Sequence, residues 1–208
     1  LVAHLNFHIQ HPAEKKAALG GIMWDPCLKP NPLMEWMMHG GPQNNFDALV
    51  GEETADPAHF FYGAHLSLKR AFLKNDHFDK SFTHYGWEDL EFGRRLAGRG
   101  LTLHPLLTAR ALHRHHYTVA DIVRRQQVSG AALAQYQPKY PVEKLLPPSH
   151  GIKHLFRVVF MVSGGAFITR QLVRLAIQLN LSFPHLFQFF TTLELRAGIR
   201  KGVRIIPN

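Results

Sequence analysis

The fold is decided by the stretch His84-Tyr85-Gly86-Trp87-Glu88-Asp89-Leu90-Glu91-Phe92-Gly93-Arg94-Arg95-Leu96. Apolar and small residues recur in it at the spacing of one helix face, at Leu90, Gly93, Leu96 and Ala97. Two glycines that favour helix termination follow at positions 98 and 100. The pattern predicts a helix that begins at the two adjacent acids and ends near these glycines.

Two carboxylates, Glu88 and Asp89, stand in or just before the first turn of this helix. The unpaired N–H groups and the positive end of the helix dipole favour ionised carboxylates there. A carboxylate held in this way beside an aromatic residue, here Trp87, has the setting of a general base. The alternative is an ordinary acidic first turn without chemistry.

Composition permits one folded domain, with or without a helical appendage, because 46% of the 208 residues are hydrophobic. The formal net charge is +9, and most of it lies from Gly151 onward, where eight basic residues accompany one acid, Glu194. Such a segment suits an anionic partner, either a membrane surface or a nucleic acid.

Cys27 is the only cysteine, which excludes an internal disulfide and a thiolate metal cluster. The chain opens on Leu1 without a signal-like segment, and we expect it to be the later part of a longer protein.

Short elements are predicted before the central stretch. They are a helix at 1–11, a short strand, loop and helix within 19–42, a surface loop at 44–58, a buried strand at 59–66, and a helix at 68–74 with Ser67 as its N-cap. His4, His8 and His11 form one line on the first helix. Two of them could share a metal ion, and the alternative is a stripe of packed or solvated histidines.

After the central stretch, residues 101–116 are expected to be extended, with Pro105 as an interruption. A strand at Leu112–His116 would put His113 and His115 on one face and His116 on the other. A helix is predicted at 117–136, and the four prolines within 137–150 indicate a boundary. We therefore expect one domain at residues 1–140 and a basic helical tail at 141–208.

The sequence pattern of the tail predicts two helices, at about 152–179 and 183–198. Its uncharged runs are too short or too polar to span a bilayer. A basic, aromatic helix pair that lies on an anionic membrane surface is one interpretation, and a pair packed on the core is the other. The expected location is cytoplasmic, with a peripheral position on the inner face of the membrane under the first interpretation.

Four motifs in order resemble the second half of a family 2 glycosyltransferase of the GT-A fold. They are Phe61-Tyr62-Gly63-Ala64-His65-Leu66-Ser67-Leu68-Lys69-Arg70, Phe78-Asp79-Lys80-Ser81-Phe82, the central Gly86–Leu96 segment, and Ala111-Leu112-His113-Arg114-His115-His116. Lys80 departs from the acid that is usual in the second motif. The resemblance covers residues 1–140 and implies an α/β fold, a partial GT-A-like, Rossmann-like core followed by the helical tail.

The resemblance implies a nucleotide-sugar donor, a divalent metal ion (Mn²⁺ or Mg²⁺) and transfer to a hydroxyl of a saccharide or lipid-linked acceptor, with inversion. It makes Asp89 the general base, Glu88 a group that orients the acceptor, and Trp87 a residue that stacks on a sugar. Gly86, Tyr62, Gly63 and Ala64 would contact substrate. His113 would be the metal ligand, with His115 second. The family's aspartate-rich metal motif does not occur in this sequence, so the chain by itself is expected to be inactive.

Two other functional classes fit parts of the sequence. The first is a membrane-surface module without catalysis, based on the basic tail; a nucleic-acid module is disfavoured because no base-reading motif is present. The second is a metallohydrolase that uses His113, His115, His116 and Glu88, although the sequence has no His-Glu-x-x-His helix.

Overall fold

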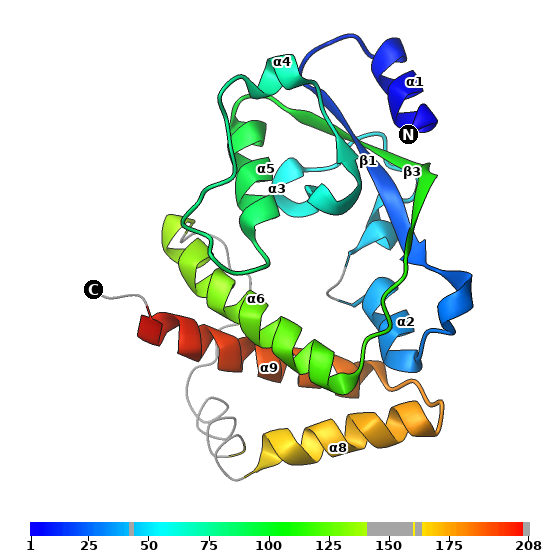
Figure 1. The fold of residues 1–208 in the computed structure, drawn as a ribbon, viewed down its shortest axis with the longest axis vertical. Coiled ribbons are helices and arrows are strands. Elements are labelled where there is room, and N and C mark those ends of the chain that lie inside the picture. Colours follow the sequence, from blue (N-terminus) through cyan, green and yellow to red (C-terminus); the bar gives the residue numbers. More distant parts are fainter. Residues whose placement is uncertain (42–43, 141–159, 161–163, 206–208) are drawn as a thin grey trace. The chain divides into compact units, whose positions relative to one another are not determined.

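The computed structural model describes residues 1–41, 44–140, 160 and 164–205. The fold is mixed α/β, with a small open sheet of three strands and several helices (Figure 1). The chain forms two compact units. The first comprises Leu1–Pro30, Met34–Ser81 and Trp87–His116, and the second Asn31–Leu33, Phe82–Gly86 and Tyr117–Asn208. The main division therefore precedes the long helix after His116, whereas the prolines had suggested residue 140.

The elements up to His116 are α1 (Val2–Gln10), β1 (Lys16–Trp24), the 3₁₀ turn η1 (Pro26–Leu28), α2 (Pro32–Met38), η2 (Phe46–Leu49), α3 (Pro57–Phe60), η3 (Gly63–His65), β2 (Leu66–Ser67), α4 (Arg70–Leu73), α5 (Glu88–Gly98) and β3 (Thr102–His113). The later helices are α6 (Val119–Lys139), α8 (Gly165–Gln178) and α9 (Pro184–Ile205). The predicted helices at the N-terminus, within 19–42, at the central stretch and after Tyr117 are confirmed. The proline-rich segment 141–150 and much of the first tail helix lie outside the described residues.

The sheet has the order β2-β1-β3. β1 pairs antiparallel with β2, with Ala18 opposite Ser67, and parallel with β3, with Trp24 opposite His113. The register of the parallel pair shifts between Gly20 and Gly21, so that β3 carries extra residues there. Because the two parallel strands end together, Trp24 and His113 lie side by side at their carboxyl ends.

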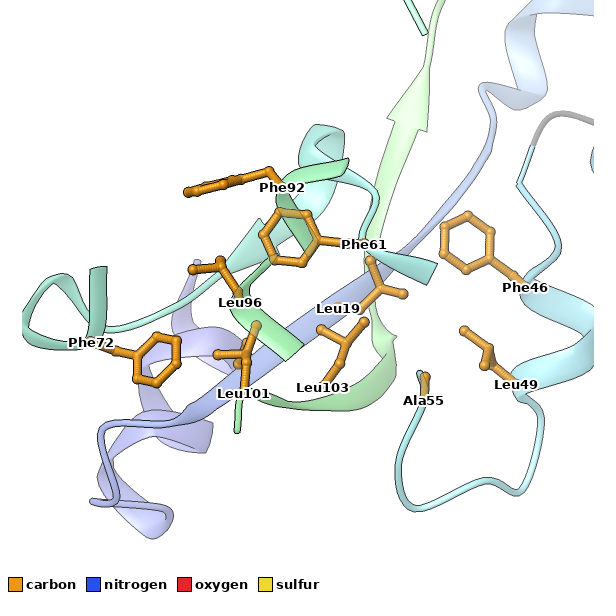
Figure 2. Close-up of a cluster of buried hydrophobic side chains, with 11 residues drawn as sticks. Leu19, Phe46, Leu49, Ala55, Phe61, Phe72, Phe92, Leu96, Leu101 and Leu103 are labelled. Carbon is orange, nitrogen blue, oxygen red and sulfur yellow. The ribbon is translucent and has the colours of Figure 1, made fainter. Parts of the chain in front are cut away.

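The core of the first unit is a cluster of buried apolar side chains (Figure 2). They come from β1, β3, α5 and the segments that pack on them: Ala17, Leu19, Phe46, Leu49, Ala55, Phe61, Phe72, Phe92, Leu96, Leu101 and Leu103. Helix α5 contributes Phe92 and Leu96, four residues apart and thus on one helix face. This buried face fixes the helix whose first turn carries Glu88 and Asp89.

The second unit is built on the packing of α9 along α6. A Cβ added at Gly130 would overlap the carbonyl oxygen of Leu195, and one added at Gly198 would overlap that of Gln127. The two glycines therefore let the helix backbones approach closely. Helix α8 packs on α9 in turn. None of the described helices combines the length and the apolar character that crossing a membrane requires.

Two predictions before the central stretch are wrong. The expected strand at 59–66 is largely the helix α3 and the turn η3, because Pro57 occupies a first-turn position and Asp56 caps the helix by accepting from the N–H of Ala58 at 2.9 Å. Only its last residue, Leu66, lies in a strand. Ser67 caps no helix; it lies in β2, and Lys69 is the N-cap of α4.

Three further expectations differ from the structure. The predicted surface loop at 44–58 buries Phe46 and Leu49 through the turn η2. Pro105 does not interrupt the extended segment, since it pairs with Leu19 inside β3. A proline is tolerated there because β3 is an edge strand of the described sheet. The strand ends at His113, so His115 and His116 lie beyond it.

Candidate active site

The first turn of α5 is entered through a sharp backbone turn. Gly86 has φ +102° and Trp87 has φ +76°. A bulky residue seldom adopts a positive φ, and such positions concentrate at functional sites. Trp87 is the N-cap, and its carbonyl accepts the first helical hydrogen bond from the N–H of Glu91 at 2.9 Å. Glu88 and Asp89 are thus the first two residues of the helix, where its dipole favours negative charge.

The carboxyl group of Asp89 contacts the backbone of Gly63. The Gly63 N–H donates a hydrogen bond to Oδ2 of Asp89 at 3.0 Å. A Cβ at Gly63 would lie 2.7 Å from Oδ1. Glycine at this position therefore leaves the space that the carboxyl group occupies.

The packing of α3 on α5 brings these two residues together. A Cβ at Gly93 would overlap both Phe61 and the carbonyl oxygen of Pro57. The ring of Phe61 meets the ring of Phe92 edge to face, with centroids 5.8 Å apart (Figure 2). Since Phe61 is two residues before Gly63, this contact holds Gly63 beside the first turn of α5.

Burial raises the pKa of Asp89 above its ordinary value of 3.8, and the hydrogen bond from Gly63 opposes this change. A carboxylate with a raised pKa is a stronger base near neutral pH. Within the described part of the chain Oδ2 accepts the hydrogen bond from Gly63, whereas Oδ1 accepts none. The group can therefore receive a proton from a hydroxyl placed at Oδ1.

Two other predicted substrate residues, Tyr62 and Ala64, differ in their exposure. Tyr62 precedes Gly63, and its ring packs edge to face on Phe46 with centroids 5.6 Å apart. Its hydroxyl accepts from the N–H of Asn45 at 3.4 Å, and burial raises its pKa. Ala64 follows Gly63 and is exposed. Tyr62 is thus partly committed to packing, whereas Ala64 is accessible.

Gly86 belongs to the second compact unit, unlike Trp87, Glu88 and Asp89. A Cβ at Gly86 would lie 3.0 Å from Oγ of Ser129, which is on α6. A glycine at position 86 is therefore explained by its positive φ and by its close approach to Ser129.

The predicted imidazoles are positioned by the carboxyl ends of β1 and β3. The ring of His113, the last residue of β3, stacks on the ring of Trp24 with centroids 5.1 Å apart. The ring of His115 stacks near that of His113 at 6.3 Å. The prediction that these two histidines lie near each other is confirmed, although His115 is outside the strand.

Asp25 was not predicted to be a site residue, because it is an isolated acid in the sequence and belongs to no recognisable motif. It is buried, accepts from the N–H of Cys27 at 2.8 Å and from Nε of Arg114 at 2.7 Å, and donates its own N–H to the carbonyl of His113. The Cys27 N–H, followed by Arg114, holds the pKa of Asp25 below its ordinary value. A usable signal was its place directly after β1, because the carboxyl ends of parallel strands meet at one edge.

The described residues do not compose a complete metal centre. No group of three or more His, Cys, Asp or Glu side chains within them could hold a metal ion. His113 and His115 offer two nitrogens at most, and both oxygens of the neighbouring Asp25 are already engaged. Mn²⁺ and Mg²⁺ sites need further oxygen ligands.

Protein-family models, curated proteins and solved structures give no match to this chain. Chemically, the arrangement around Asp89 offers one partly buried carboxylate at a helix start, a backbone N–H that fixes one of its oxygens, and an aromatic residue, Trp87, two positions before it in the sequence. These groups suit proton abstraction from a hydroxyl.

Proposed function

We propose that this chain forms the acceptor side of a glycosyltransferase, which moves a sugar from a nucleotide-sugar donor to a hydroxyl of a saccharide or lipid-linked acceptor. The observation that carries the proposal is the Asp89 carboxyl group, held by the Gly63 N–H at the start of α5 with a raised pKa. The order of the four motifs is the second support. The imidazole pair His113 and His115 is the third.

In the proposed step, Asp89 removes the proton of the acceptor hydroxyl as its oxygen attacks the anomeric carbon of the donor. A new carbon–oxygen bond forms while the bond to the nucleoside diphosphate breaks, and the bonding pair leaves with the diphosphate. One such in-line displacement inverts the anomeric carbon. The positive end of the α5 dipole and the Gly63 N–H orient the base.

The neighbouring residues have supporting roles in this proposal. Trp87 stacks on a sugar ring, and Glu88 orients the acceptor. Gly63 and Ala64 let the acceptor approach, because the first has no side chain and the second is small and exposed. A divalent ion would stabilise charge on the leaving diphosphate. Since the described residues do not fit a complete metal site, no step is assigned to it.

The test is a donor and acceptor screen with the Asp89→Asn variant of the complete protein, because this chain by itself is expected to be inactive. Transfer from a panel of nucleotide sugars is measured by release of nucleoside diphosphate together with the mass of the glycosylated acceptor. Loss of the general base should lower transfer by about 10²-fold or more. Asp47→Asn, at an exposed carboxyl group of the same unit, is the matched control and should keep the rate.

Circular dichroism and the urea midpoint establish that both variants are folded. Transfer by folded Asp89→Asn at the unchanged rate would refute the role of Asp89. Metal-dependent hydrolysis without any sugar transfer would favour the metallohydrolase alternative.

A further inference from the structure

The outward side of α8 is apolar. The helix buries Gly165, Thr169, Val173 and Ala176. Its exposed apolar side chains are Phe167, Ile168, Leu172, Leu175 and Leu179, each of which is about half exposed or more. Ile168, Leu172, Leu175 and Leu179 follow the spacing of a single helix stripe beside the buried face. An apolar stripe of this length on a solvent-exposed protein surface indicates an interaction site.

The stripe continues into a pocket. The pocket lies at the corner where the chain passes from α8 to α9, whose backbone is drawn in Figure 1. The pocket has a volume of about 500 Å³. Apolar side chains from both helices and from their connection line it, among them Leu172, Leu175, Leu179, Leu181, Phe183 and Leu186. His185 is the only polar residue among the described residues that line it. A pocket of this size with almost no hydrogen-bonding group suits a hydrocarbon chain.

The charge around the stripe is positive. Between Gly151 and Leu193 the sequence has no Asp or Glu. Arg174 is exposed and directly precedes Leu175, so it lies about 100° around the helix from that side chain. Arg170 is instead turned to the buried Glu194, with Nε 2.7 Å from Oε1. Two copies joined through this face would bring like charges together, which disfavours a dimer.

We propose that the corner formed by α8 and α9 docks on a bilayer that contains anionic phospholipid. The apolar stripe enters the acyl region, one acyl chain occupies the pocket, and Arg174 pairs with headgroup phosphates. A helix in this position lies in the plane of the interface, about 5–10 Å deep, and does not cross the bilayer. Lipid binding here is independent of the proposed sugar transfer.

The test is flotation of the full chain with vesicles of phosphatidylcholine alone and of phosphatidylcholine mixed with phosphatidylglycerol. We expect binding to the mixed vesicles, weakened by added salt. Leu172→Gln/Leu175→Gln should lower the partition coefficient by about tenfold or more, since each change removes a leucine from the acyl region. Arg174→Gln should lower it about fivefold, and only on the anionic vesicles.

Matched controls are Val50→Gln/Leu112→Gln, which changes two exposed apolar residues of the first unit, and Arg110→Gln. Both should bind like the unaltered protein. Because the stripe residues are exposed, their replacement should leave the urea midpoint unchanged, and this is measured in parallel. Absence of vesicle binding, or equal binding by the Leu172→Gln/Leu175→Gln variant, would overturn the proposal. A dimer by light scattering that the same variant dissociates would show that a second copy covers the face.

Discussion

The backbone N–H of Gly63 donates a hydrogen bond to Oδ2 of Asp89 at 3.0 Å. This contact joins two motifs that lie 26 residues apart in the sequence. It fixes one oxygen of a partly buried carboxylate, and under the proposed function the other oxygen receives the proton of the acceptor hydroxyl. It also makes the identity of residue 63 a condition for the geometry of the site, because a Cβ there would lie 2.7 Å from Oδ1.

Gly63→Ala should therefore lower transfer without unfolding the protein. The φ of Gly63 is not in the left-handed region, so alanine is compatible with the backbone, but its methyl group displaces the carboxyl group of Asp89. We expect kcat/KM to fall by about 10²-fold, as for other misplaced catalytic groups. Gly98→Ala is the matched control, since a Cβ there meets no atom within 4 Å. Equal values of kcat/KM for Gly63→Ala and Gly98→Ala would show that the absence of a side chain at residue 63 is not required for transfer.

The pH dependence of transfer should report the raised pKa of Asp89. A general base must be ionised, so kcat/KM should fall as the pH falls through the pKa of Asp89 in the free enzyme. Burial raises that pKa, and the acidic limb should lie above the ordinary value of 3.8. The measurement is kcat/KM between pH 4 and 8 with ionic strength held constant. The absence of an acidic limb within this range would contradict the assignment.

Part of this site could be predicted from the sequence because its signals are local. The helix that begins at Glu88 follows from periodicity and stop signals, and an extended segment at 101–116 was also predicted, although the strand itself ends at His113. The contact between Gly63 and Asp89 could not be predicted, because it depends on the packing of Phe61 against Gly93. The burial of Asp25 is another long-range result, since Arg114 lies 89 residues away.

The histidines of α1 also illustrate this limit. The sequence predicted their line on one helix face but not their partners. His4 Nδ1 and His8 Nε2 contact the hydroxyl of Ser67 at 2.7 and 2.9 Å, and His4 Nε2 lies 3.2 Å from Nε2 of His65. Nδ1 of His65 donates to the carbonyl of Gly21 at 3.0 Å. With neutral rings only one direction of donation is consistent, from His8 through Ser67 and His4 to His65.

Stability should therefore fall as the pH falls below about 6.5. Burial is the main cause that lowers the pKa of His4 and of His8, with His65 next for His4 and Lys69 next for His8. The unfolded chain then binds more protons than the folded chain below the ordinary value of 6.5. The free energy of unfolding should lose up to about 1.4 kcal/mol per pH unit for each histidine in that range. Urea unfolding at pH 7.5, 6.5 and 5.5 measures it.

His4→Gln should reduce this pH dependence without abolishing it, because it removes one histidine with a lowered pKa while His8 and His104, whose pKa values burial also lowers, remain. His84→Gln, at an exposed histidine, should preserve it. An equal slope in His4→Gln and in the unaltered protein would mean that other groups control the acid response.

The ion pair of the second unit gives a last prediction, on stability alone. Glu194 is 1% exposed; its Oε1 accepts from Nε of Arg170 at 2.7 Å, and its Oε2 accepts from Nε2 of Gln127 at 2.7 Å. Glu194→Gln leaves Arg170 partly buried without its counter-charge, and should lower the free energy of unfolding by about 3 kcal/mol. Arg124→Gln breaks an exposed pair and should change it by less than about 1 kcal/mol. The double change Glu194→Gln/Arg170→Gln should recover part of the loss, because no uncompensated charge remains. Urea unfolding of the three variants measures these differences, and a double variant less stable than Glu194→Gln would show that Arg170 contributes through packing instead.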